Sequence, residues 1–531
     1  MPFASSGTEM GNDATTSPNR WISSAAKVLR GLFALHSIRK RELPEVLLVC
    51  GMFVYSLFFS IYLTQKYQDF RTGYFDFGQA VQTAWLVSQG HLNALALGRP
   101  ITIIAGLVYA IYPHPETLLA LQSSALSTGA LAIYVLAKRE LGNKWFSLTF
   151  SLLYLINPLL WGVSQYEYHD LAFSVPFLLF AVYFYATRRF RPYLVSLTLA
   201  LMCNPFVIII ATVMAIWFLM DSRSELFAKR SLVFPLATAI TCVAFIVYLQ
   251  IIPLLPFYHL YTLGIQSYTF LGSREYVNPL SALADPLESV SYALPQKISY
   301  VLSLLGPTIF FSLLSGRRFL PALPWLSIVI IYSPALAAGG VGPVFVFSQW
   351  SSFLIPFVFV GAIYGFTRAA SFTSTRKLRT FGAKTLLVTM ILITLLLSTL
   401  TGGVSPFSRP TQFSTGDSSV PNDAVTDNFY HPIWPSPVKD SATLDWFAAQ
   451  IPLNYSILTQ NQIGSKVGER AAPVFIFYQP HYQDMYADAI LVDYNLPGLC
   501  TSCLNSILAS GRYISYLSFD EGPIVLFYRV R

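Results

Sequence analysis

Charged side chains are scarce in this sequence: Asp, Glu, Lys and Arg make up 11% of its 531 residues, whereas a soluble protein carries about 25%. Hydrophobic residues make up 54%. This composition excludes a soluble protein and predicts an integral membrane protein with many spans. The net charge of +8 does not indicate nucleic-acid binding, because the basic residues gather in short loops between apolar runs, as they do in the cytoplasmic loops of membrane proteins.

Cysteine and the common chemical motifs are scarce as well. Three of the five cysteines fall in apolar segments, which excludes a disulfide framework. No thioredoxin-like context surrounds the other two, Cys500 and Cys503, so they predict a local disulfide rather than a redox site. The C-terminal part has no Gly-rich phosphate loop and no His/Cys metal spacing, and the chain has no repeat of 20–50 residues.

Long apolar runs, by contrast, are frequent, and each is close to the ~20 residues needed to cross ~30 Å of hydrocarbon. The candidate spans are residues 44–64, 116–137, 145–163, 171–187, 231–254, 295–315, 319–337, 351–368 and 383–401. The first of them begins beyond residue 40 and is too long for a signal peptide, so it is expected to stay as an anchor. Segment 101–112 is too short for a span, and segment 193–220 is too long and carries Cys203-Asn204-Pro205 in its middle.

The basic residues predict the topology, because cytoplasmic loops carry an excess of Lys and Arg. They cluster before the first span and between later ones. All these clusters are cytoplasmic only if segment 101–112 does not cross the membrane and segment 193–220 forms two short helices that turn at Asn204. The sequence therefore predicts about 11 spans, with the N-terminus inside and the C-terminus outside the cell.

The C-terminal part has a different pattern. Helices are expected at 441–451 and 501–510, and the runs between and after them are of the β type. The expected strands are Ser456–Thr459, Val474–Phe477, Ala489–Val492, Tyr513–Tyr516 and Ile524–Phe527, the last two forming a hairpin. The predicted fold is a mainly α, polytopic membrane bundle with a small extracytoplasmic α/β domain. Its parts are a cytoplasmic tail (1–43), the transmembrane domain (44–401), a Ser/Pro/Gly/Thr-rich linker (402–440) and the α/β domain (441–531).

This topology brings polar residues from three loops to the same, non-cytoplasmic face. Asp76 follows the first span, and can be a helix cap at the interface, with Trp85 as a belt residue, or a catalytic carboxylate. Glu167 and His169 precede Asp170, which can equally be the N-cap of the next helix. Asn204 fits a helix break beside Pro205 better than a ligand. A polar cluster at the outer ends of packed helices is typical of a membrane-interface active site.

Several short motifs carry a resemblance to a known family. They are the run Asp76-Phe77-Gly78 with Gln82 and Trp85, the run Leu118-Leu119-Ala120-Leu121-Gln122, the pair Asn157-Pro158, and His169. With these residues the chain resembles domain-of-unknown-function family 2079, polytopic membrane proteins of prokaryotes, over roughly residues 45–531. That family is in turn similar to the GT-C superfamily, multispan glycosyltransferases that have an acidic residue in the first external loop and use polyprenyl-phosphate-linked sugars.

The resemblance implies a membrane glycosyltransferase that moves a sugar from a polyprenyl-phosphate donor to an acceptor on the extracytoplasmic face of the cell membrane. Asp76 is then the base that deprotonates the acceptor, with His169 and Glu167 beside it. The leaving phosphate needs a cation, for which Arg99 is the best placed. The full set of candidate substrate-binding residues is Arg99, Gln82, Trp85, Asp170, Asn204, Arg71 and Arg274. Glu167 and His169 are also candidate ligands of a divalent ion, although scattered ligands do not make a metal site.

Two other functions stay open at this point. A transporter or flippase for a lipid-linked substrate would place polar residues near the midplane in two matching halves, whereas here they gather at one face. A non-catalytic envelope protein is compatible with two departures from the family pattern, the absence of a His before Pro100 and Asn204 in place of an acidic residue. The expected partners are membrane lipids and the polyprenyl-phosphate sugar, and no nucleic acid.

Overall fold

The computed structural model describes most of the chain. The described residues are 42–91, 99–222, 232–251, 286–292, 294–331, 349–371, 376–400, 438, 440–477, 487–496, 498–518 and 522–530. The predicted linker and cytoplasmic tail lie almost entirely outside these residues, as does Arg274. The chain divides into Met1–Leu47 and Leu48–Arg531; the described part of the first unit is the start of one helix, and the remaining elements belong to the second.

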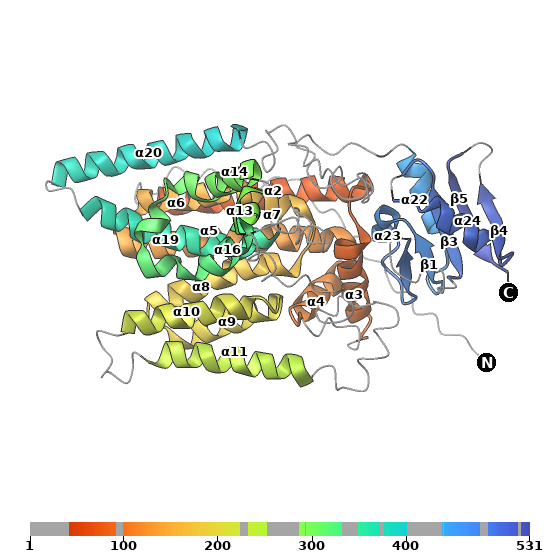
Figure 1. The fold of residues 1–531 in the computed structure, drawn as a ribbon, viewed down its shortest axis with the longest axis horizontal. Coiled ribbons are helices and arrows are strands. Elements are labelled where there is room, and N and C mark those ends of the chain that lie inside the picture. Colours follow the sequence, from red (N-terminus) through yellow and green to blue (C-terminus); the bar gives the residue numbers. More distant parts are fainter. Residues whose placement is uncertain are drawn as a thin grey trace, which may run out of the picture. The chain divides into compact units, whose positions relative to one another are not determined.

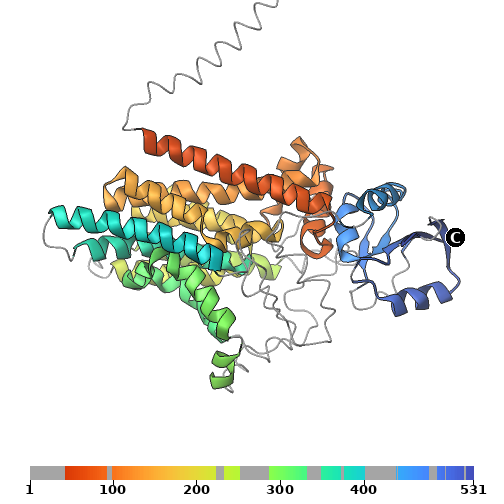
Figure 2. The ribbon, with the colours of Figure 1, turned by 90° about the horizontal axis from the view of Figure 1, so that it is seen from above.

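In the described part of the first four hundred residues the elements are helices, and the long ones run roughly parallel to one another (Figures 1 and 2). In chain order they are α2 (Leu43–Gln68), η2 (Tyr74–Gly78), α3 (Gln79–Ser88), α4 (Thr102–Ile111), α5 (Pro115–Leu141), α6 (Lys144–Leu155), α7 (Pro158–Tyr166), η4 (Asp170–Phe173), α8 (Ser174–Ala186), α9 (Phe190–Cys203), α10 (Val207–Ser222), α11 (Val233–Ile251), α13 (Pro286–Ser291), α14 (Leu294–Leu305), η8 (Gly306–Thr308), α15 (Phe311–Leu314), η9 (Gly316–Ala322), α16 (Leu323–Ile330), η10 (Gln349–Phe353), α19 (Ile355–Ser371) and α20 (Arg376–Leu400).

Several helices are long and apolar enough to cross a membrane. Within the described ranges these are the segments Leu43–Gln68, Pro115–Leu141, Val233–Ile251 and Trp350–Ser371. The consecutive helices α6 and α7 pass the same test together, with a bend of 45° between them. A mainly helical membrane protein is therefore confirmed, whereas the full set of about 11 spans stays a prediction.

Two predicted spans are interrupted where hydropathy alone suggests continuity. The run 145–163 bends at Asn157-Pro158, because proline has no N–H to continue the helix and the Asn157 side chain accepts hydrogen bonds from Leu159 and Leu160, capping a new one. The run 295–315 is broken after Leu305, where Gly306-Pro307 form a short turn of 3-10 helix.

The two segments that do not fit a span length form short helices. Residues 102–111 make the single helix α4. The long segment is divided into α9 and α10, and Asn204 Oδ1 accepts a hydrogen bond from the Phe206 backbone N–H at 2.9 Å in the break. The prediction of two helices that meet at Asn204 is therefore confirmed.

The C-terminal domain contains the predicted five-stranded sheet. Its strands are β1 (Ile457–Thr459), β2 (Val474–Ile476), β3 (Ala489–Asp493), β4 (Tyr513–Ser518) and β5 (Ile524–Arg529), in the order β2-β1-β3-β5-β4. The first three strands are parallel, and β5 is antiparallel to both β3 and β4, which confirms the expected hairpin. Helix α22 (Ser441–Ala449) precedes β1, α23 (Asn461–Lys466) lies between β1 and β2, and α24 (Thr501–Ala509) lies between β3 and β4.

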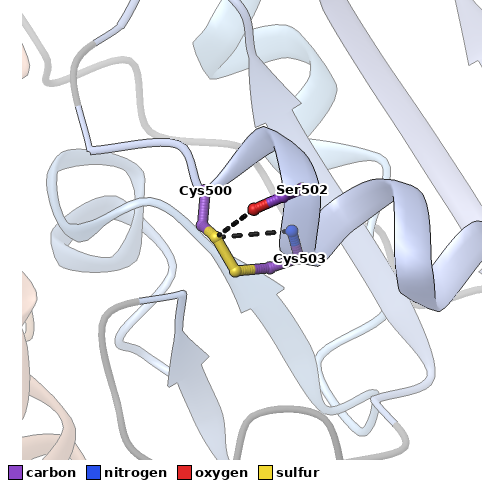
Figure 3. Close-up of a disulfide and its surroundings, with 3 residues drawn as sticks. All are labelled: Cys500, Ser502 and Cys503. Carbon is purple, nitrogen blue, oxygen red and sulfur yellow. Dashed lines mark hydrogen bonds between the residues drawn. A yellow bond between two sulfur atoms is a disulfide. The ribbon is translucent and has the colours of Figure 1, made fainter.

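Cys500 and Cys503 form a disulfide at the start of α24, as predicted (Figure 3). The Cys500 Sγ also accepts a hydrogen bond from the Cys503 backbone N–H at 3.3 Å, so the bridge closes the first turn of the helix. The remaining cysteines, Cys50, Cys203 and Cys242, are free thiols.

The predicted topology can be tested with an impermeant thiol reagent. Asn505 is exposed on α24 and Arg191 is exposed at the start of α9. In intact cells, and in a Cys50→Ser background, we expect Asn505→Cys to be labelled and Arg191→Cys to be labelled only after the membrane is permeabilised. Labelling of Arg191→Cys in intact cells would contradict the orientation, and with it the predicted extracytoplasmic location of the α/β domain.

Candidate functional site

Asp76 lies in a single π-helical turn, η2, between α2 and α3. Gly73 is extended, and the Gly78 N–H donates to the Gly73 carbonyl at 3.1 Å, five residues earlier, before the chain continues as α3. Single π turns are rare and are frequent at functional sites, since they widen the helix and redirect a side chain. The turn therefore presents Asp76 at the end of the first long helix, as the sequence predicts, but in a helical class that the sequence does not indicate.

The Asp76 carboxylate contacts the last residue of α7 and the segment that follows this helix. The Tyr166 hydroxyl donates to Asp76 Oδ2 at 2.8 Å, and His169 Nε2 lies 4.0 Å from the same oxygen. The rings of Tyr166 and His169 stack with their centroids 4.5 Å apart. The Asp76 side chain is 26% exposed and that of His169 is 8% exposed, so the carboxylate is oriented by buried groups and still reaches the surface of the site.

Glu167 is fully buried next to the same turn. Its Oε1 accepts a hydrogen bond from the Gly73 backbone N–H at 2.9 Å. Burial raises the pKa of Glu167 from 4.5 to about 8; the charge of Lys66 opposes this increase and the charge of Asp76 adds to it. The Lys66 ammonium group is itself buried and donates to the carbonyl groups of Gln165 and Tyr166. Near neutral pH Glu167 is therefore largely protonated, which lowers the cost of burying it.

His169 is held in place by a glutamine of α5. Gln122 donates to the Glu167 carbonyl at 2.7 Å and accepts from the His169 N–H at 2.5 Å, so its amide group bridges both ends of this extended segment. Burial lowers the pKa of His169 to about 4, an effect that Asp76 opposes and Arg99 strengthens. His169 is therefore neutral near pH 7 and able to donate or accept one hydrogen bond.

Arg99 joins the cluster through Asp170. Its Nη1 lies 3.2 Å from Asp170 Oδ2, and the Tyr168 hydroxyl donates to the other carboxylate oxygen at 3.1 Å. The Arg99 side chain is 44% exposed whereas that of Asp170 is 3% exposed. Asp170 thus anchors one side of a guanidinium group whose remainder is open to solvent.

A family model described as "Predicted membrane protein (DUF2079)" matches residues 66–506, most of the chain. The chain belongs to this family. No curated protein matches the sequence. The match confirms the resemblance to the DUF2079 family, and its membrane character agrees with the apolar helices.

The DUF2079 motif residues have two different surroundings. Asp76 and His169 meet at the site, and Gln122 supports it. Gln82 is buried on α3 and donates to the carbonyl groups of Arg470 and Ala472 in the C-terminal domain at 3.1 and 3.0 Å, while it accepts from the Tyr74 hydroxyl at 2.7 Å. Its amide therefore joins two parts of the protein, a role that the sequence does not indicate because the partners are nearly 400 residues away.

The other candidate residues are more dispersed. Trp85 is half-buried on α3, where it packs against an apolar cluster, and Asn204 stabilises its helix break. Arg71 is half-buried just before the π turn, and its N–H donates to the Lys66 carbonyl. Substrate contacts from these residues stay predictions. Among the described residues no group of three or more His, Cys, Asp or Glu side chains could hold a metal ion, so the suggestion of a divalent ion at Glu167 and His169 also stays a prediction.

Gln122 and Tyr166 take part in the site although the sequence did not assign them to it. A usable signal existed for Gln122, because it belongs to the family motif. No comparable signal exists for Tyr166, which is one of 31 tyrosines in the chain. Its position one residue before Glu167 becomes informative only when the end of α7 is known.

The raised pKa of Glu167 predicts a specific pH dependence of stability. The folded-state pKa of Glu167, about 8, exceeds its ordinary value of 4.5. The contribution of Glu167 to the free energy of unfolding is therefore fully present below about pH 4.5 and is lost as the pH rises through 8. The lowered pKa of His169 acts in the acid range instead, because its neutral form is lost as the pH falls from 6.5 to about 4. The range above pH 7 therefore separates the titration of Glu167 from that of His169.

Glu167→Gln keeps an oxygen that can accept from Gly73 and removes the ionisation. We expect its thermal unfolding midpoint, measured in detergent, to fall less between pH 7 and pH 9 than that of the wild type. Asp445→Asn, at an exposed carboxylate of the C-terminal domain, is the control and should keep the wild-type slope. Equal slopes for Glu167→Gln and the wild type would show that Glu167 does not titrate in this range.

Proposed function

We propose that this DUF2079 protein is a membrane glycosyltransferase of the GT-C kind, which transfers a sugar from a polyprenyl-phosphate donor to an acceptor on the extracytoplasmic face of the membrane. The proposal rests on the surroundings of the Asp76 carboxylate. This group is partly exposed, accepts a hydrogen bond from the Tyr166 hydroxyl at 2.8 Å, and lies in a π turn next to a buried histidine and a buried glutamic acid. Such an arrangement provides a base at the ends of apolar helices, where a lipid-linked substrate is accessible.

In this proposal Asp76 is the general base. The acceptor hydroxyl gives its proton to Asp76 as its oxygen bonds to the anomeric carbon of the sugar, and the bond from that carbon to the phosphate oxygen breaks with its electron pair on the phosphate. Tyr166 donates to one carboxylate oxygen, which fixes the orientation of the group and leaves its other oxygen for the acceptor. Holding the reacting groups in this way accounts for a large part of enzymatic acceleration.

The buried neighbours support this assignment because they separate the roles of two carboxyl groups. Glu167 is shielded from water and keeps its proton to about pH 8, so near neutral pH it is a neutral group that stabilises the turn. Asp76 is the more exposed of the two and contacts hydrogen-bond donors. Pairs of carboxyl groups in such unequal environments are typical of sites in which one group accepts a proton and the other does not.

Arg99 has the surroundings of a phosphate-binding residue. Its guanidinium group is oriented by Asp170 on one side and is 44% exposed, and a guanidinium group can bind two phosphate oxygens through parallel N–H donors. It also lies close enough to His169 to affect its pKa. Arg99 can therefore stabilise the negative charge on the leaving polyprenyl phosphate.

Asp76→Asn tests the base directly, since it keeps the shape of the side chain and a hydrogen-bond acceptor for Tyr166 but removes the basic carboxylate. We expect at least the ~10²-fold lower transfer typical of losing a general base, with unchanged expression and membrane insertion. The assay measures transfer from polyprenyl-phosphate sugars in membranes, and Asp445→Asn is the matched control. Full activity of Asp76→Asn would contradict the assignment, and wild-type membranes inactive with every donor would favour a non-catalytic envelope protein.

Arg99 calls for a paired design, because removing it alone leaves the buried Asp170 carboxylate without its cation, which is destabilising. We expect the double variant Arg99→Ala, Asp170→Asn to raise the KM for the lipid-phosphate donor by about tenfold or more, the effect of losing one charge-assisted hydrogen bond. Arg99→Lys should show a smaller increase. Arg191→Ala, an exposed arginine of α9, is the control. An unchanged KM in the double variant would assign the phosphate to another cation.

A further inference from the structure

The π turn that carries Asp76 is in contact with the C-terminal domain as well as with the helices. Helix α23 packs against η2, and the buried side chains of Phe70 and Tyr74 belong to the same apolar cluster as Leu444, Ile463 and Ile476 of that domain. The connection that follows α2 and the start of the turn thus form part of the hydrophobic core of the α/β domain.

The hydrogen bonds at the start of the turn come from two directions. The first N–H groups of a helix have no partner within it and need one from outside. Here the Gly73 N–H donates to Glu167 Oε1 at 2.9 Å, and the next N–H, of Tyr74, donates to Asn461 Oδ1 at 2.8 Å. One cap comes from the end of the helical bundle and the other from the first residue of α23.

Further contacts on both sides of Asp76 hold the same two parts together. Before it, the hydroxyl groups of Thr72 and Ser465 are hydrogen-bonded at 3.0 Å. After it, Gln82 donates to Arg470 and Ala472. Arg470 is 2% exposed and donates to the carbonyl groups of Val467 and Tyr455, which fixes the loop that Gln82 reaches.

Glycines allow the two backbones to approach closely. A Cβ atom at Gly468 would lie 2.9 Å from the Gly78 carbonyl oxygen, and one at Gly464 would lie 2.7 Å from the Tyr74 Cβ. Both distances are shorter than a carbon atom tolerates without displacement of its neighbours. The close fit involves Tyr74 and Gly78, the first and last residues of the turn that contains Asp76, so a shift of the domain would be transmitted to the turn.

We propose that Asn461 is a positioning residue, through which the C-terminal α/β domain holds the π turn of Asp76 in its active geometry. The domain is then an integral part of the transfer site, and Asp76 is correctly placed only while α23 is docked on the turn. This inference rests on the proposed function for its catalytic consequence, whereas the docking itself can be measured without activity.

The experiment combines hydrogen exchange with kinetics on the full-length protein in lipid nanodiscs. Asn461→Ala removes the cap of Tyr74 and is expected to increase amide exchange in peptides covering residues 72–82 by about fivefold, the effect of losing one helix cap. It should lower kcat by about tenfold or more through misplacement of Asp76 and leave the KM for the donor unchanged. Asn461→Asp, whose side chain can accept the same hydrogen bond, should restore both values, and Asn505→Ala, exposed on α24, should match the wild type.

Each outcome decides the proposal. Unchanged exchange at residues 72–82, or increased exchange with wild-type kcat, overturns it. If the amides of β3 also exchange faster in Asn461→Ala, the domain itself has unfolded, and Ser465→Ala becomes the deciding variant. This substitution removes the hydroxyl group that contacts Thr72. It should increase amide exchange at residues 72–82 while β3 stays protected, and an unchanged exchange rate there overturns the proposal. An inactive wild type with increased exchange in Asn461→Ala would refute the proposed function while the docking of α23 on the turn stands.

Discussion

The structure depends on a simple constraint, that two consecutive backbone N–H groups at the start of a helical turn must find hydrogen-bond acceptors away from water. An unpaired buried N–H costs about 1–3 kcal/mol, and a single π turn has little cooperative stability of its own. Gly73 and Tyr74 meet this need with a glutamic acid from the end of α7 and an asparagine from α23. The helical bundle and the C-terminal domain are therefore connected at the residues that precede Asp76.

Burial then determines the charge state around Asp76. Glu167 is shielded enough to keep its proton near neutral pH, and His169 is shielded enough to lose its own. The Lys66 ammonium group donates to the carbonyl groups of Gln165 and Tyr166, and Asp170 lies 3.2 Å from the Arg99 guanidinium group. A site built in this way has few mobile charges and a fixed arrangement of donors, which is what electrostatic stabilisation of a transition state requires.

The sequence predicts the α/β domain better than the membrane domain, for a physical reason. Each strand is bounded by turn residues and contains β-branched or aromatic residues, so local pattern and tertiary structure agree at Val474–Ile476 and Ile524–Arg529. Hydropathy, by contrast, does not register a proline within an apolar run, and the breaks at Asn157-Pro158 and Gly306-Pro307 need backbone geometry to be seen. The meeting of Asp76 with Glu167 and His169 agrees with the predicted topology, in which the charge pattern places their loops on one face.

The two functions of the family motif could not be separated from the sequence. Asp76, Gly78 and Gln82 are spaced as on one helical element, which suggests a shared task, yet the extra residue in the π turn directs them differently. Asp76 points to Tyr166 in the bundle, whereas Gln82 reaches a loop about 390 residues further along the chain, and Gly78 leaves room for the backbone of Ser465. No local pattern records such a distant partner. A motif of this kind therefore describes a catalytic candidate together with the surface that holds it, and its residues should be assigned to one task or the other by their contacts rather than by their spacing.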